Sequence, residues 1–248
     1  MRHELTIGTR TAIFVIALLL LLPLAVYAAD DFTDADAKAL ISDDPDAAAD
    51  VLYKLQDIFS EKGKDGLKTA VPHLIAATER ELGLPEDARW NLVDIVKIIS
   101  LTGDERVKPM LLRIMSVMWG GGNPFVAQGL LSIGHSTLAD VVDSLKSTSP
   151  DTKGRAAITL HKMNQGDDSK AFFTSDDREK IKKGLLANLK DENVQVRIYT
   201  VMAMRSFGDN SVFSALEHIE KHDAHKDSGG TYEVRLEASE TLKHLKAK

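Results

Sequence analysis

Three histidines near the end of the chain have the types and spacing that most resemble a ligand site. His218, His222 and His225 are four and three residues apart, which places them along one side of a helix. Imidazole is a common ligand of zinc and copper, and Glu217 and Asp223 could add oxygen ligands. The competing interpretation is that these histidines are polar residues flanking a buried stripe. We favour it because two or three histidines at helical spacing are common by chance.

Two aromatic segments could contact a partner. Three glycines follow Trp119, so a ligand could approach the backbone there and stack on the indole, but the same glycines are also ordinary turn residues. The Lys-Ser or Lys-Thr that a phosphate-binding loop needs does not follow. Phe172 and Phe173 lie side by side in the polar insert 167–177. They could dock a partner, or one of them could fill the space beneath the loop.

The usual signatures of catalysis are missing from the sequence. It contains no cysteine, no Gly-x-Ser-x-Gly motif and no glycine-rich dinucleotide turn. Carboxylates are numerous but scattered, as a solvated helical surface alone would produce. We therefore expect a protein that is not an enzyme and that carries no cofactor.

The first thirty residues have the layout of a secretory signal peptide. Arg2 and Arg10 precede a long apolar run, and Val26 and Ala28 occupy the −3 and −1 positions of a small-residue cleavage site. The sequence thus predicts a signal peptide over 1–28 and a protein that is periplasmic or secreted by a bacterium. The alternative is an uncleaved anchor, because the apolar run approaches the ~20 residues of a spanning helix. Cleavage would leave no stable membrane insertion.

Charge and cysteine content narrow the possible partners. The 248 residues include 31 Lys and Arg against 37 Asp and Glu, a net charge of −6. An acidic chain repels a phosphate backbone, so we do not expect nucleic acid as a partner. With no cysteine, stability must come from a packed core rather than from disulfides. Residues 29–46 contain seven aspartates and are expected to form a flexible acidic lead-in to a domain over 47–248.

From residue 47 onward the chain alternates predicted helices and turns. Four turns share a glycine followed by a polar residue, at spacings of 31, 32 and 42 residues: Gly103, Gly134, Gly166 and Gly208. Eight and seven residues before these glycines the positions are mostly apolar: Ile95, Val126, Ile158 and Thr200, then Val96, Ala127, Thr159 and Val201. Each unit would be a helix, a glycine in the left-handed conformation and a capped second helix. Stacking of such pairs predicts an all-α fold.

A family resemblance supports this organisation. The segment Asp191–Arg197, followed by Phe207-Gly208-Asp209, resembles a HEAT-like repeat of the short bacterial type found in PBS-lyase-type proteins. Its Val196-Arg197 pair recurs 38 residues later as Val234-Arg235, and Lys153-Gly154-Arg155 is a weaker copy upstream. The resemblance covers roughly residues 85–246 and implies a right-handed α-solenoid. It also implies a structural role, in a ladder with acidic residues between units, for Arg155, Arg197 and Arg235.

The enzymes that share such repeats fit this sequence poorly. Some HEAT-like proteins attach bilin pigments in the cytoplasm, which an exported protein would not meet. Di-iron hydroxylases of this fold use repeated His-Glu pairs, and the one such pair here is His3-Glu4. DNA glycosylases need a basic groove. We therefore expect a non-enzymatic binding or scaffold protein that presents a helical-repeat surface to a protein or peptide partner in the cell envelope. The alternative is a metal-binding protein or enzyme that uses the histidine helix.

Overall fold

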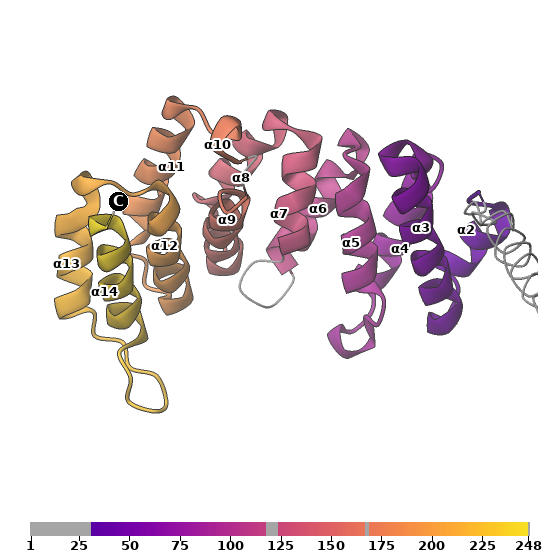
Figure 1. Ribbon diagram of the computed structural model, residues 1–248. Coiled ribbons are helices and arrows are strands. Elements are labelled where there is room, and N and C mark those ends of the chain that lie inside the picture. The colour runs from indigo at the N-terminus through magenta and orange to yellow at the C-terminus, as the bar shows by residue number, and fades with distance from the viewer. Residues whose placement is uncertain (1–30, 118–123, 167–168, 248) are drawn as a thin grey trace, which may run out of the picture. The chain divides into compact units, whose positions relative to one another are not determined.

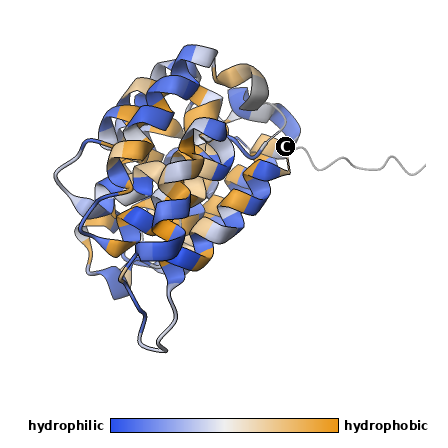
Figure 2. Ribbon diagram, turned by 90° about the vertical axis from the view of Figure 1, so that its left-hand side faces the viewer, coloured by the Kyte–Doolittle hydropathy of each residue, from blue (hydrophilic) through white to orange (hydrophobic). Residues whose placement is uncertain are grey.

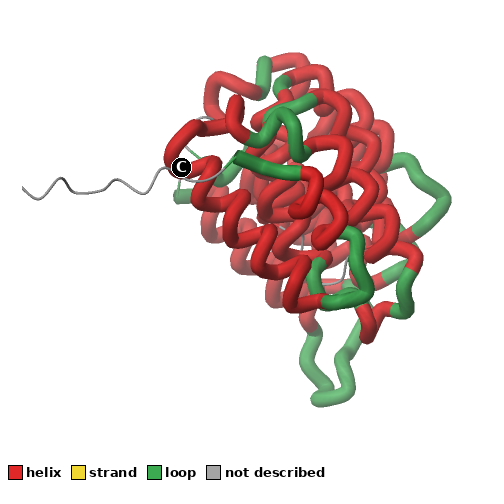
Figure 3. The backbone as a smooth tube through the Cα atoms, turned by 90° about the vertical axis from the view of Figure 1, so that its right-hand side faces the viewer, coloured by secondary structure: helices red, strands yellow, loops and turns green. Residues whose placement is uncertain are grey.

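The computed structural model describes residues 31–117, 124–166 and 169–247, and these residues form helices and loops without a strand (Figures 1 and 3). The prediction of an all-α fold is therefore confirmed for this part of the chain. The chain divides into two units, Met1–Asp30 and Asp31–Lys248, and the fold given below is that of the second. The predicted signal peptide, 1–28, lies outside the described residues.

A first layer of helices runs in chain order, and each of its members packs against the next. Its helices are α3 (Pro45–Gly66), α5 (Leu92–Thr102), α7 (Pro124–Ile133), α9 (Pro150–Met163), α12 (Val194–Phe207) and α14 (Glu233–Lys246). A second set packs on the first layer: α4 (Val71–Gly83), α6 (Lys108–Val117), α8 (Leu138–Ser144), α11 (Ser175–Asn188) and α13 (Phe213–His222). The other α-helices of the described residues are α2 (Asp34–Leu40) and α10 (Ser169–Phe172).

The repeat register identified in the sequence corresponds to the buried core. The eight side chains that lie eight and seven residues before the shared glycines are at most 2% exposed. They lie on first-layer helices, where a spacing of 3.6 residues per turn brings them to one face. Most helices carry hydrophobic and hydrophilic residues together, as Figure 2 shows. Burial of these faces between neighbouring helices is the main source of stability that the sequence offers, because disulfides are absent.

The shared glycines do not all play the predicted role. Gly103 ends α5 in the predicted left-handed conformation, with φ 60° and ψ 18°. Gly134 has a positive φ of 118°, but its ψ of −175° is not that of the left-handed conformation, so the prediction is wrong at this glycine. Gly208 is extended instead, with φ −76° and ψ 154°. A Cβ at Gly208 would lie 2.6 Å from the Met204 carbonyl oxygen and 3.0 Å from Leu245 Cδ1. The prediction of a left-handed turn is wrong there, and the close approach of the Met204 carbonyl oxygen and of Leu245 on α14 explains the glycine.

The acidic segment 29–46 also differs from the predicted flexible lead-in. It contains α2, which begins at a capping box in which Thr33 and Asp36 satisfy each other's backbone N–H groups. Ala37 and Leu40 are buried, and α2 packs on α3 and α4. The aspartates in its first turn favour the helix because they lie near its positive N-terminal end. The aspartate content of the segment predicts disorder because it takes no account of where the aspartates lie in the helix.

Within the described residues, no single helix is long and apolar enough to cross a membrane. The bent pair 124–133 and 135–144, with 117° between its arms, meets that test of length and composition when the two helices are taken together.

Candidate functional site

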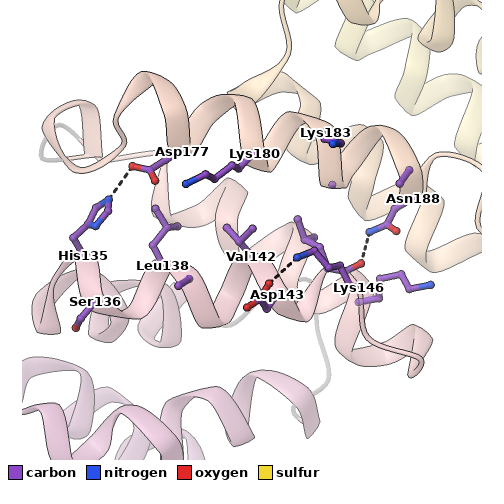
Figure 4. A pocket seen from close by; sticks show the side chains of 15 residues that line it. His135, Ser136, Leu138, Val142, Asp143, Lys146, Asp177, Lys180, Lys183 and Asn188 are labelled. Carbon is purple, nitrogen blue, oxygen red and sulfur yellow. Dashed lines mark hydrogen bonds and ion pairs between the residues drawn. The ribbon is translucent and has the colours of Figure 1, made fainter.

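A groove of about 890 Å³ lies between α8 and α11 (Figure 4). Its apolar floor comes from Leu138, Val142 and Leu145 on the α8 side, and from Gly184 and Ala187 on α11. Polar and charged residues surround this floor: His135, Ser136, Asp143, Lys146, Lys153, Asp177, Lys180, Lys183 and Asn188. The groove is thus an apolar strip bordered by charge, which is the usual composition of a ligand-binding surface.

The two helices that border the groove differ in length, and α9 and the insert separate them in the chain. α8 has 7 residues and α11 has 14. The two come close at Gly184, where a Cβ would lie 2.9 Å from Leu145 Cδ1. The buried Asn188 amide also donates to the Leu145 carbonyl, at 3.0 Å. One end of the groove is therefore closed by direct packing of α11 on the end of α8.

A histidine and an aspartate close the other end. His135 Nε2 lies 2.8 Å from Asp177 Oδ2. The Asp177 carboxylate also accepts hydrogen bonds from the N–H and the hydroxyl of Thr174, which is the N-cap residue of α11. Burial alone would raise the pKa of Asp177, but the hydrogen bonds from Thr174 and His135 hold it below its ordinary value. From Asp177 to Asn188 the groove follows α11 for about 16 Å, at roughly 1.5 Å per residue.

The arrangement at the His135 end is not a catalytic triad. Ser136 lies beside His135 in sequence, but its hydroxyl donates to Glu105 at 3.3 Å. No hydrogen bond joins Ser136 to His135 in the part of the chain that the structure describes. A nucleophilic serine needs its hydroxyl bonded to the histidine that accepts its proton. The groove therefore provides surfaces for binding but lacks an activated nucleophile among its described lining residues.

The aromatic residues singled out in the sequence have different positions. Phe173 is 4% exposed and packs edge-to-face on Phe207, at 5.2 Å between ring centroids. Phe172 is half-buried, with its ring 5.6 Å from that of His135 at the end of the groove. Of the pair, Phe173 belongs to the core beneath the insert, and Phe172 packs against His135, which lines the groove. Trp119 lies outside the described residues.

The three histidines do not come together as a ligand set. His218 and His222 are exposed on α13 with their ring centroids 4.8 Å apart, while His225 lies beyond the end of that helix. The possible oxygen ligand Asp223 is already bonded to Arg197 through both carboxylate oxygens. Among the described residues, no group of three or more His, Cys, Asp or Glu side chains is placed to hold a metal ion.

Arginine and aspartate side chains join successive helix pairs. Arg197 on α12 donates to the Asp223 carboxylate at 2.7 and 3.1 Å, and to the Asp191 carbonyl at 2.9 Å. Arg235 on α14 in turn donates to the Asp223 carbonyl, at 2.6 Å. The preceding unit has a corresponding pair, in which Lys153 on α9 lies 2.5 Å from the Asp191 carboxylate. Each aspartate thus accepts from the preceding unit through its side chain and from its own unit through its carbonyl.

Arg155 makes a contact of a related kind. Its guanidinium donates to the Ser116 carbonyl at the end of α6, 39 residues earlier. The three arginines of the repeat motif are therefore bonded to backbone carbonyls or to a buried carboxylate. All of these bonds connect helices, and none of the three arginines lines the groove.

The lysines of the groove and two exposed aromatic residues are not among the residues that the sequence singled out. Trp90 is 75% exposed just before α5, and Tyr53 is 65% exposed on α3. The available signal for Trp90 was a tryptophan between two polar neighbours. Lys180 and Lys183 carried no sequence signal beyond their spacing on one helix, because only the placement of α8 gives that face a neighbour.

A buried histidine outside the groove makes stability depend on pH. His161 is 8% exposed, and its ring nitrogens lie 2.8 Å from Ser206 Oγ and 2.9 Å from Gln165 Nε2. Burial, together with the charges of Lys162 and Arg205, lowers its pKa from 6.5 to about 4. The unfolded chain therefore binds more protons than the folded chain between these two values, so this histidine destabilises the fold as the pH falls through that window.

We expect His161→Gln to flatten the acid side of the stability profile. Between pH 7.5 and pH 5 the wild-type chain should lose about 2 kcal/mol of its unfolding free energy through this residue, and the variant should not lose that share. Urea unfolding followed by circular dichroism at the two pH values measures the difference. An equal loss in wild type and variant would contradict a neutral buried imidazole.

Comparisons with known proteins leave the family open. No protein-family model matches the chain, and no curated protein matches it. A similar solved structure is a crystal structure of an engineered protein from the Northeast Structural Genomics Consortium, with 17% sequence identity and a TM-score of 0.44. The match covers 87% of this chain and 98% of that one. A likeness at this level carries no argument about function.

Proposed function

We propose that this chain is a non-enzymatic binding or scaffold protein that holds a segment of a partner protein in the groove between α8 and α11. In this proposal the helix pairs form a right-handed α-solenoid of HEAT-like repeats, exported to the periplasm or the exterior of a bacterial cell. The observation that carries it is the groove itself, an apolar strip about 16 Å long with charged borders and closed ends.

The dimensions of the groove suit a short peptide segment. A length of about 16 Å corresponds to roughly three turns of helix or five residues of extended chain. Peptide-binding surfaces commonly combine an apolar floor, which provides affinity, with polar edges, which fix orientation. Rigid helices on both sides would hold the floor in place without a large ordering cost on binding.

The proposal predicts that a charge on the floor abolishes binding. Val142 is half-buried in the middle of the α8 side, so Val142→Glu would force a carboxylate into the interface. We expect the affinity for the partner segment to fall at least about tenfold, which is ~1.4 kcal/mol. Affinity purification from chemically crosslinked cell envelopes, with wild type and variant compared by quantitative mass spectrometry, measures this loss.

The matched control is Ser214→Glu, which adds the same charge at an exposed position of α13 away from the groove. A partner that is recovered with wild type and Ser214→Glu but lost with Val142→Glu supports the proposal. Recovery of the same proteins with all three chains would rule out the groove as the binding surface.

A further inference from the structure

The basic residues of α11 fall into two groups according to the side of the helix. Arg178 donates to Asn164 Oδ1 at 3.0 Å and stacks on Phe173, while Lys182 pairs with Glu179 and Asp209, each at 2.7 Å. These two residues hold α11 to its neighbours. The hydrogen bonds to Asp209 and Glu179 also raise the pKa of Lys182.

Lys180 and Lys183 lie on the groove side of the same helix and are exposed. Neither forms an ion pair with a carboxylate of the described residues, although Asp176 and Glu179 each lie four residues upstream, a spacing that often allows one. The two lysines are three residues apart, so their Cα atoms lie about 4.5 Å apart along the helix axis. Figure 4 shows both lysines on the α11 side of the gap, opposite Leu138 and Val142.

The other lysines that line the groove already have partners. Lys146 is bonded to Asp143 at 2.8 Å, and Lys153 to Asp191 at 2.5 Å. Asp177, the remaining carboxylate of the lining, is bonded to His135 and Thr174. The groove of this acidic chain therefore has an excess of positive charge, concentrated in Lys180 and Lys183.

We propose that the occupant of the groove is an acidic peptide segment, in which apolar side chains cover the floor and two carboxylates pair with Lys180 and Lys183. This inference rests on the proposed function and adds the chemistry of the partner. Covering the apolar floor removes water from one side of the lysines, which strengthens their attraction to a carboxylate. A basic segment would instead leave both lysines facing like charge.

Selection of 12-residue random peptides on the full chain tests the inference. We expect the selected peptides to combine apolar residues with at least two Asp or Glu residues. A synthetic copy of the best peptide, labelled with fluorescein, then serves as the probe in anisotropy titrations. Its affinity should fall about tenfold when its acidic residues are replaced by Gln or Asn. The affinity of the acidic peptide should also fall more steeply with salt concentration than the affinity of the substituted peptide.

Substitutions in the chain should give the complementary result. Lys180→Gln/Lys183→Gln should weaken the acidic peptide about tenfold and leave the neutral peptide unchanged, as a double-mutant cycle requires of an interacting pair. The matched control is Lys221→Gln/Lys243→Gln, which removes the same charge from exposed positions on α13 and α14. This control should bind the acidic peptide as the wild type does.

The possible failures separate the two proposals. Selected peptides that Val142→Glu releases, but that lack acidic residues or bind equally after their replacement, would overturn the acidic partner and leave the groove standing. Peptides whose binding Val142→Glu does not change, or a selection without any binder, would overturn the groove and the acidic partner together. Binding of anionic phospholipid vesicles that depends on Lys180 and Lys183, in place of peptide binding, would assign these lysines to a membrane surface.

Discussion

Replacing Arg197 by alanine should reduce the free energy of unfolding by about 3–5 kcal/mol, the usual cost of breaking a buried ion pair. The Asp223 carboxylate is 5% exposed, and both of its oxygens accept from Arg197. Burial would raise the pKa of Asp223, but the hydrogen bonds from Arg197 and from the His225 N–H keep it below its ordinary value. Alanine would leave that carboxylate buried without its main partner. Urea denaturation followed by circular dichroism measures the loss.

The chain offers a matched control in another arginine–aspartate pair. Arg106 bonds Asp104 at 2.7 Å, but its side chain is 55% exposed. Arg106→Ala should cost much less than Arg197→Ala, because solvent screens an exposed pair. If Arg197→Ala and Arg106→Ala cost the same, Arg197 does not join the helix pairs as the contacts indicate. Asp223→Asn in the Arg197→Ala background should recover part of the loss, since it removes the unpaired charge.

Gly208→Ala should cost about 3 kcal/mol, at the upper end of what overpacking a well-packed core typically costs. The new methyl group would lie 2.6 Å from the Met204 carbonyl oxygen, and 3.0 Å from the side chains of Leu245 and Val212. The backbone oxygen cannot turn aside as a flexible side chain can. Relief would require the backbone at the end of α12 to change and α14 to move away from it. Thermal and urea unfolding of the variant measure the cost.

Gly83→Ala is the control for Gly208→Ala. Gly83 ends α4 without a positive φ, and nothing lies within 4 Å of a Cβ placed there. Alanine at this position should be neutral or stabilise the fold by up to about 1 kcal/mol, because it restricts the unfolded chain. A Gly208→Ala variant as stable as Gly83→Ala would show that the Met204 carbonyl oxygen and α14 do not approach this position as described.

The sequence predicted the core better than it predicted the turns. Ile158 and Thr200 were assigned to the same repeat position, and both are fully buried, because helical periodicity reports burial directly. Gly208 was assigned a left-handed conformation by analogy with Gly103, although it is extended. A glycine signals either an unusual φ or a close neighbour, and only the position of α14 distinguishes these two causes.

The groove could not be predicted for a similar reason. Val142 and Ala187 are apolar residues of ordinary amphipathic helices, and nothing in the local sequence shows that their helices diverge between closed ends. The insert 167–177 marks the place where the spacing of the units changes, and its two phenylalanines left open whether it docks a partner or fills the space beneath the loop. The insert contains α10 and the start of α11, and its Phe173 fills the core. The site depends on how α8 and α11 are placed relative to each other, and the pattern of a single sequence does not show this placement.

Site-specific photocrosslinking tests the central claim most directly. A photoreactive amino acid would replace Ala187, which is exposed on the groove side of α11, and in a second chain Ser214, which is exposed on α13. Irradiation of living cells followed by mass spectrometry of the adducts identifies what lies against each position. Our account predicts one reproducible adduct from Ala187, mapping to an acidic segment of a single envelope protein and absent from Ser214. Equal adducts from both positions, or none from Ala187, would contradict a partner-binding groove between α8 and α11.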